Sequence, residues 1–188
     1  GNSKASIEKI LSDIYKSNPE KWKIANLRYF NPIGSHHSGL IGEDPKQSMN
    51  NIFPLILKVA SKEINKFKIY GSDWPTLDKT CIRDYIHVMD VAEGHLKTLE
   101  YLYSSKPQVL DLNLGTSKGT SVLDLINTFQ KVNNIKVPYV FTSRRKGDKP
   151  FVVANNGLAK ELLNWAPTRN LDDMCRDGWN YKKNNSKK

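Results

Sequence analysis

Stretches with helical periodicity alternate with short apolar stretches along most of this chain, and that alternation limits the folds open to it. From Ser3 to Lys16, apolar residues recur at offsets of three and four, which is the period of one helix face. A strand is predicted next, from Ile24 to Phe30, and Asn31-Pro32 closes it. Helices that alternate with strands are typical of an α/β protein, which is the fold class we predict.

The same alternation continues to the end of the chain. Further strands are predicted at 67–70, 81–88, 110–114 and 137–141. Further helices are predicted from residue 52, from 90 to about 103 and from 122, and two short helices close the chain. Asp90 with Glu93, and Ser121 with Asp124, are spaced as capping pairs. The core face of the helix after Asp90 is predicted to carry Ala92, Leu96, Leu99 and Tyr103.

Composition excludes several classes of protein. The 188 residues, of which 38% are hydrophobic, are enough for one folded domain or for one domain and part of another. No run approaches the roughly 18 apolar residues of a membrane span, and no signal peptide is recognisable, so no membrane partner is expected. Two cysteines, Cys81 and Cys175, are too few for a disulfide scaffold and indicate a reducing, cytoplasmic setting.

The net charge is strongly positive, because 29 Lys and Arg face 19 Asp and Glu, which gives +10. Four of the lysines fall in an Asn/Ser/Lys-rich tail, residues 182–188, which we expect to be frayed. One compact basic cluster remains, made of Arg144, Arg145, Lys146 and Lys149. Such a cluster fits a small anionic ligand better than the long phosphate track of a nucleic acid, which stays a minor alternative.

Five segments carry a family resemblance. They are Ser3-Lys4, Leu27-Arg28-Tyr29-Phe30-Asn31-Pro32, Gly42-Glu43-Asp44-Pro45, the run from Arg83 to Ala92 (Arg-Asp-Tyr-Ile-His-Val-Met-Asp-Val-Ala), and Asn113-Leu114-Gly115. Together they resemble the UDP-glucose 4-epimerases of the extended short-chain dehydrogenase/reductase superfamily. The run from Arg83 is shared by several nucleotide-sugar enzymes, whereas the second and third segments point more narrowly to the 4-epimerase. The resemblance covers almost the whole chain, but only the carboxyl-terminal half of the family's usual length.

The resemblance implies a division into two interleaved domains. Residues 1–32 and 88–112 would be elements of an incomplete NAD-binding Rossmann domain. Residues 33–87 and 113–181 would form the smaller α/β domain that binds the nucleotide sugar, and residues 182–188 would be a basic tail. The implied reaction is the NAD-dependent interconversion of UDP-glucose and UDP-galactose through a 4-keto intermediate. The implied assembly is a homodimer that uses the first helix, whose apolar stripe consists of Ile7, Ile10, Leu11 and Ile14.

The resemblance also implies where the cofactor is held. In the family a tyrosine is the base, and a lysine four residues later lowers its pKa and holds the nicotinamide ribose; Lys4 matches that lysine. The tyrosine would precede Gly1, and the Gly-rich unit for the NAD pyrophosphate is also missing, so this chain alone is expected to be inactive. Tyr29 and Phe30 match residues beside the nicotinamide. From residue type alone, a buried strand aromatic is the simpler interpretation of Tyr29.

Substrate-binding positions are implied along the rest of the chain. They are Asn31, Asn51, Ile52, Lys68, Tyr70, Arg83, Arg145, Asp148 and Val152. The chemistry agrees with these roles, because guanidinium groups form forked bonds to a diphosphate and an aromatic ring stacks on uracil. The free N–H groups at a helix start, predicted at Asn51, also favour an anion. Taken singly, the charged residues would more often be surface ion-pair members, Asn51 a plain helix cap and Tyr70 a core residue.

Val152 bears on specificity. Many bacterial members have a tyrosine there, near the C2 substituent of the sugar, so the smaller valine predicts room for an N-acetyl group.

The remaining polar residues are expected to be structural. His87 is interpreted as a strand-end histidine bonded to backbone, and Asp84 with Tyr85 as fixing a strand–helix corner. The adjacent His36 and His37 lack further ligand spacing, so no metal site is predicted. Two other functions stay open: a nucleotide-sugar dehydratase, decarboxylase or epimerase of another specificity, and a non-catalytic module that binds UDP-sugars.

Overall fold

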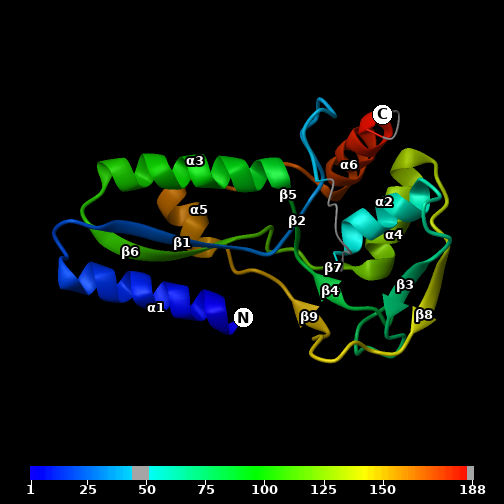
Figure 1. Cartoon of the computed structure of the whole chain (residues 1–188), viewed down its shortest axis with the longest axis horizontal. Helices are drawn as coiled ribbons and strands as arrows, with labels where there is room; N and C mark the ends of the chain where they lie inside the picture. Colours follow the sequence, from blue (N-terminus) through cyan, green and yellow to red (C-terminus); the bar gives the residue numbers. More distant parts are fainter. Residues whose placement is uncertain (44–50, 186–188) are drawn as a thin grey trace.

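The computed structural model describes residues 1–43 and 51–185, which form two lobes side by side (Figure 1). In the first lobe, β1 (Lys23–Tyr29) and β6 (Gln108–Leu114) pair in parallel, with Lys23 opposite Gln108 and Tyr29 opposite Leu114. Helix α1 (Asn2–Ser17) lies below these strands and α3 (Val88–Ser104) above them in the view of Figure 1. A parallel pair with helices on both faces is the α/β arrangement that the alternating pattern predicts.

Successive side chains of β6 point to opposite faces of this sheet, and the two faces make different contacts. Leu112 and Leu114 are fully buried, and they pack with Val91 of α3 and with Ala159 and Leu163 of α5 (Gly157–Leu163). On the opposite face, polar contacts attach α1 to the sheet. Arg28 of β1 donates to both carboxylate oxygens of Glu8, at 2.7 and 2.6 Å, and to Asp111 of β6 at 3.0 Å.

The second lobe has its own apolar core. It contains α2 (Ile52–Ala60), β3 (Phe67–Tyr70), α4 (Val122–Asn133), β8 (Tyr139–Thr142) and α6 (Leu171–Asn185), with β3 and β8 paired in parallel. Its most deeply buried apolar side chains include Ile56, Ile69, Leu125, Ile126, Phe129 and Met174. Ser121 caps α4 by accepting from the backbone N–H of Asp124 at 3.0 Å, so the predicted Ser121 cap is confirmed.

Short strands join the lobes. Strand β2 (Asn31–Ile33) pairs in parallel with β5 (Tyr85–His87), and β4 (Ile82–Arg83) lies between β7 (Thr120–Ser121) and β9 (Phe151–Val152). The strand predicted over 81–88 is therefore divided at Asp84.

The side chain of Asp84 fixes this division. Its buried carboxylate accepts from the backbone N–H groups of Thr116, Ser117 and Ala154 at 2.8, 2.9 and 3.2 Å, and from the Thr116 hydroxyl at 2.6 Å. Asp84 therefore does fix a corner, but this corner lies between the strands β4 and β5 and not between a strand and a helix, as was predicted.

Two predictions for α3 are wrong. Its cap is His87, whose Nδ1 accepts from the backbone N–H of Met89 at 3.0 Å. Asp90 is instead buried against Arg169, with Asp90 Oδ1 and Arg169 Nη1 2.5 Å apart. Asp90 thus forms an ion pair with a residue far along the chain instead of the predicted cap of its own helix.

The predicted core face of α3 is also wrong. Ala92 is exposed, and Leu96, Leu99 and Tyr103 are 56%, 53% and 84% exposed, whereas Gly94 and Thr98 are buried. A Cβ on Gly94 would lie 2.9 Å from Leu114 of β6, so the missing side chain allows the helix to approach the sheet closely. Gly94 and Thr98 thus face the sheet together with Val91, whereas the predicted large residues do not.

The end of the chain is more ordered than predicted. Lys182 and Lys183 belong to the last turn of α6, and Lys182 Nζ lies 2.6 Å from Glu63 Oε1. The prediction of a frayed tail is wrong for these two lysines, and residues 186–188 lie outside the described part. Among the helices of the described residues, none is long and apolar enough to cross a membrane.

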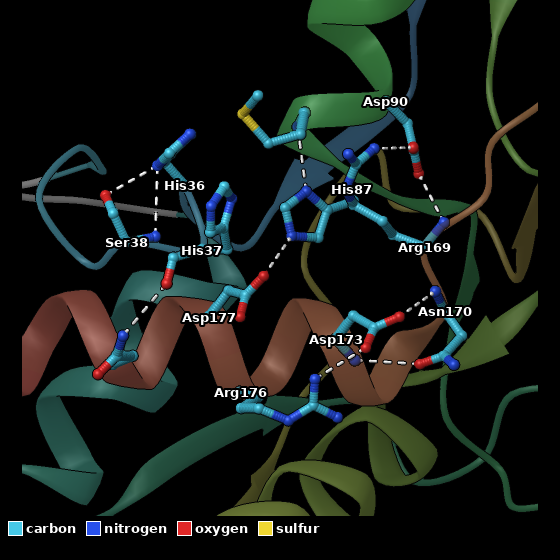
Figure 2. A network of polar contacts seen from close by, with 12 residues as sticks. His36, His37, Ser38, His87, Asp90, Arg169, Asn170, Asp173, Arg176 and Asp177 are labelled. Atoms are coloured by element: carbon cyan, nitrogen blue, oxygen red, sulfur yellow. Dashed lines mark hydrogen bonds and ion pairs between the residues drawn. The ribbon is translucent and has the colours of Figure 1, made fainter.

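A polar network surrounds the start of α3 (Figure 2). The fully buried His87 bonds through Nδ1 to the Met89 backbone, as predicted for a strand-end histidine, and its Nε2 lies 3.2 Å from Asp177 Oδ2 of α6. Burial lowers the pKa of His87, and this effect outweighs the opposing influence of Asp177 and Asp90. Arg169, which also faces the ring, acts in the same direction as burial. The neutral ring is therefore the form that the fold stabilises.

We predict that this histidine makes folding sensitive to mild acid. Because the His87 pKa is lower in the folded chain than the ordinary value of 6.5, the unfolded chain binds a proton first as pH falls. Stability is then fully present above about pH 7 and declines toward the folded-state pKa, by at most about 1.4 kcal/mol per pH unit. In His87→Asn, whose amide oxygen can still cap α3, this decline should be smaller.

Urea unfolding of both proteins between pH 5 and 7.5 checks the prediction. His37→Asn, at an exposed histidine, is the matched control and should retain the wild-type slope. Equal slopes for His87→Asn and the wild type would show that His87 is not the responsible group.

Candidate functional site

A cleft of about 390 Å³ lies where the two lobes meet. Its wall combines the start of α1, the end of β1 and β2 from one side with the start of α2, β3, β4 and the loop before β9 from the other. The amino end of α1 points toward the second lobe, which brings Lys4 to this wall (Figure 1).

Eleven of the twelve site residues predicted from the sequence line this cleft. They are Lys4, Tyr29, Phe30, Asn31, Asn51, Ile52, Lys68, Tyr70, Arg83, Arg145 and Asp148. Within the described residues, the lining does not include Val152, which is half-buried in β9 and pairs with Arg83 of β4. Of the third resemblance segment, Gly42 and Glu43 are described, whereas Asp44 and Pro45 lie outside the described residues.

At one end of the cleft, β1 runs into β2. Tyr29 is 51% exposed and its ring is 6.0 Å from that of His95, so its interpretation as a buried strand aromatic is wrong. Phe30 is half-buried and its backbone N–H donates to Leu114 at 3.3 Å. The exposed Lys4 lies on the first turn of α1. This end of the cleft thus offers an open aromatic ring and an amine.

Two arginines lie on the opposite wall. Arg83 Nη1 donates to the carbonyls of Ile82 and Lys149, both at 2.8 Å, and Arg83 Nη2 lies 3.7 Å from Asp148 Oδ1. The Arg145 guanidinium lies over the Tyr70 ring, 4.2 Å from its centre. Both guanidinium groups are therefore held in place by groups of the protein itself.

The start of α2 faces the same cleft. Asn51 is the residue before this helix, is exposed, and makes no side-chain capping hydrogen bond, so the plain-cap interpretation gains no support. Ile52 opens the helix, and Asn50 lies outside the described residues. Free N–H groups at a helix start attract anions.

The charged groups of the lining favour an anionic ligand. In the described part of the wall, Lys4, Lys68, Arg83 and Arg145 supply four cations, against the carboxylates of Glu43 and Asp148. Clefts with an excess of one charge concentrate ligands of the opposite charge.

Two buried side chains, Cys81 and Tyr85, also belong to the lining. Burial raises the pKa of the Cys81 thiol and of the Tyr85 hydroxyl, so both stay protonated. Among the described residues, the Tyr85 hydroxyl is a buried polar atom without a hydrogen-bond partner. Tyr85 is two positions after Arg83, and the alternation along a strand was a signal that both face the cleft. Its hydroxyl is a donor that a ligand oxygen would satisfy.

The histidine pair lies outside this cleft. The rings of His36 and His37 are 4.2 Å apart, and His36 Nδ1 lies 2.8 Å from the Ser38 hydroxyl (Figure 2). Among the described residues, no three or more His, Cys, Asp or Glu side chains are grouped so that they could hold a metal ion.

Comparisons with known proteins agree with this arrangement. Residues 1–115 match the model of the NAD dependent epimerase/dehydratase family. The UDP-glucose 4-epimerase of Pasteurella multocida is 47% identical over 187 residues, which cover 100% of this chain and 55% of that protein. The chain thus spans about half the length of the curated relatives that it matches.

Solved structures give the same result. UDP-glucose-4-epimerase from Stenotrophomonas maltophila, with bound NAD and formylated UDP-arabinopyranose, superposes with a TM-score of 0.94 at 40% identity, over 97% of this chain and 54% of that one. UDP-glucose 4-epimerase from Bifidobacterium longum, in complex with NAD+ and UDP, superposes with a TM-score of 0.89 at 40% identity, over 95% of this chain and 52% of that one.

These findings confirm the predicted resemblance to UDP-glucose 4-epimerases and the predicted α/β fold of the extended short-chain dehydrogenase/reductases. NAD is the cofactor of the family, as the name of the family and the NAD-bound structures both indicate. From its sequence, its fold and the side chains of its cleft, the chain belongs to the NAD dependent epimerase/dehydratase family.

Proposed function

We propose that this chain is the carboxyl-terminal half of an NAD-dependent UDP-glucose 4-epimerase, and that its cleft binds the UDP-sugar. The observation that carries the proposal is the convergence of Arg83, Arg145 and the start of α2 on one cleft. These groups come from distant parts of the chain, and all of them suit a diphosphate.

The two arginines would hold the diphosphate from one wall. Each guanidinium has donors in a planar fork that matches phosphate oxygens. Asn31, which lies opposite Tyr85 in the β2–β5 pair, would donate its amide hydrogens from the floor. Lys68 of β3 adds a further cation at the edge.

The nucleoside would lie beside β3. Tyr70 offers an aromatic face for uracil, and Asp148 accepts hydrogen bonds from ribose hydroxyls. One face of Tyr70 carries the Arg145 guanidinium, so we place the base on the other face.

NAD fits the opposite end of the cleft. The open ring of Tyr29, with Phe30 beside it, can cover an uncharged nicotinamide, and the Lys4 amine can donate to ribose hydroxyls. When bound, NAD supplies the acceptor for hydride from C4 of the sugar. The residues of this chain bind and orient the sugar nucleotide so that the sugar lies toward Tyr29.

We predict that the chain binds UDP through Arg145. Replacing this side chain in Arg145→Gln removes charge-assisted hydrogen bonds, each worth about 1.5–3 kcal/mol, and should weaken UDP binding by roughly 10–100-fold. Isothermal titration calorimetry at constant salt measures the effect. The control is Arg176→Gln on α6, whose guanidinium pairs with Asp173 2.8 Å away. No UDP binding by the wild-type chain, or equal affinity in Arg145→Gln, contradicts the proposal.

We also predict that these 188 residues do not epimerise UDP-galactose by themselves. They contain neither a tyrosine four positions before Lys4 nor a Gly-rich unit for the NAD pyrophosphate. A coupled assay with UDP-galactose and added NAD should stay at background. Turnover that survives repurification and is lost in Arg83→Ala would overturn this expectation.

The partner we propose for α1 is a second copy of the chain. Ile7, Ile10 and Ile14 are 55%, 57% and 36% exposed, whereas Leu11 is half-buried. Burial of a large aliphatic side chain contributes about 1.5–3 kcal/mol, so this exposed stripe favours association.

Light scattering at micromolar concentration tests this assembly. We expect a dimer for the wild type and a shift toward monomer for Ile10→Lys. Leu77→Lys, at a fully exposed loop leucine, is the control. A monomeric wild type would refute the proposed dimer. The separate proposal that the cleft binds UDP would stand.

A further inference from the structure

The loop between β8 and β9 carries two of the proposed ligand contacts but has no regular structure. Residues 143–150 contain Arg145 and Asp148, and these two are joined by a hydrogen bond of 3.2 Å from the Asp148 N–H to the Arg145 carbonyl. Gly147, between them, has a φ of +88°. Because the loop belongs to neither a helix nor a strand, its side-chain contacts must determine where Arg145 points.

Arg144 makes the densest set of these contacts. Its Nε donates to Asp73 Oδ1 and its Nη2 donates to the Asp73 carbonyl, both at 2.7 Å. The same guanidinium lies over the ring of Trp74, 4.2 Å from its centre. Within the described lining of the cleft, Arg144, Asp73 and Trp74 do not appear.

Trp74 is a firm support for this stack. The residue is only 5% exposed, and its Nε1 donates to the Tyr70 carbonyl at 3.0 Å. Gly71, with a φ of +85°, makes room for it, since a Cβ there would collide with Trp74 Nε1.

The two neighbouring arginines therefore stack on two linked aromatic residues. Arg144 lies on Trp74 and Arg145 on Tyr70, each guanidinium 4.2 Å from a ring centre. The hydrogen bond from Trp74 to Tyr70 joins the two stacks. At the other end of the loop, Arg83 donates to the Lys149 carbonyl at 2.8 Å. The loop is thus held on both sides of the segment that faces the cleft.

We infer that Arg144, outside the cleft, is a positioning residue that holds Arg145 and Asp148 ready for the ligand; this inference rests on the function proposed above. An arginine that is already ordered loses less conformational freedom on binding than a mobile one. Arg144 is 43% exposed at its side chain and Asp73 is 69% exposed, so their ion pair adds little to global stability. The effect of the Arg144–Asp73 ion pair is instead to order the loop locally.

The test has one readout that needs ligand and one that does not. In Arg144→Gln, limited trypsin digestion followed by mass spectrometry should show cleavage after Lys146 at least about fivefold faster than in the wild type, because local opening controls proteolysis. UDP affinity, measured by calorimetry, should fall about tenfold. The thermal midpoint should shift by less than about 2 °C.

Two further variants sharpen the result. Arg144→Lys keeps the charge but loses the planar fork and the stacking surface, so it should remain defective; full recovery of UDP affinity would mean that charge alone matters and would overturn the inference. Arg176→Gln, the same substitution at an exposed ion pair on α6, should match the wild type in both readouts.

The outcomes separate this inference from the proposed function. If the wild type binds UDP and Arg144→Gln changes neither proteolysis nor affinity, the positioning role is wrong and the function stands. If the wild type fails to bind UDP, the function fails for this chain. The proteolysis rate then decides the role of Arg144 in ordering the loop, and an unchanged rate overturns that role.

Discussion

The buried carboxylate of Asp84 holds the junction on which both lobes and the cleft depend. It ties the loop after β6, through Thr116 and Ser117, and the segment after β9, through Ala154, to the point where β4 passes into β5. The carbonyl of Asp84 also accepts from the Asn31 N–H at 3.1 Å. Hydrogen bonds to a charged group are worth about 1.5–3 kcal/mol each, and a buried carboxylate without them would be strongly unfavourable. These hydrogen bonds therefore fix the point at which the strand is divided into β4 and β5.

That junction explains how the cleft acquires its chemistry. Asp84 points toward the loops, so Arg83 and Tyr85 on either side of it take the opposite direction and line the cleft. The parallel pairing of β2 with β5 sets Asn31 beside Tyr85. Arg83 in turn bonds to the carbonyl of Lys149 and extends this order to the loop that carries Asp148. The ligand contacts are thus consequences of the backbone arrangement at the lobe junction.

The alternation of elements and most of the cleft lining followed from sequence periodicity and motif matching, because both depend on local residue order. Predictions failed where distant partners intervened. Asp90 has the spacing of a helix cap, but Arg169, 79 positions away, draws it into a buried ion pair. The large apolar residues of α3 suggested a core face, yet Gly94 and Thr98 permit closer packing on the sheet. From its residue type Tyr29 was predicted to be a buried strand aromatic, but it is exposed because β1 ends at the cleft.

The central claim is that a diphosphate lies between Arg83 and Arg145, with uracil beside Tyr70. A crystal structure of this chain with UDP measures it most directly. The account predicts phosphate oxygens within about 3.2 Å of both guanidinium groups and of the backbone at the start of α2, and the base against the face of Tyr70 opposite Arg145. Density for UDP at another surface, or in the cleft with its phosphates turned away from both arginines, would contradict it.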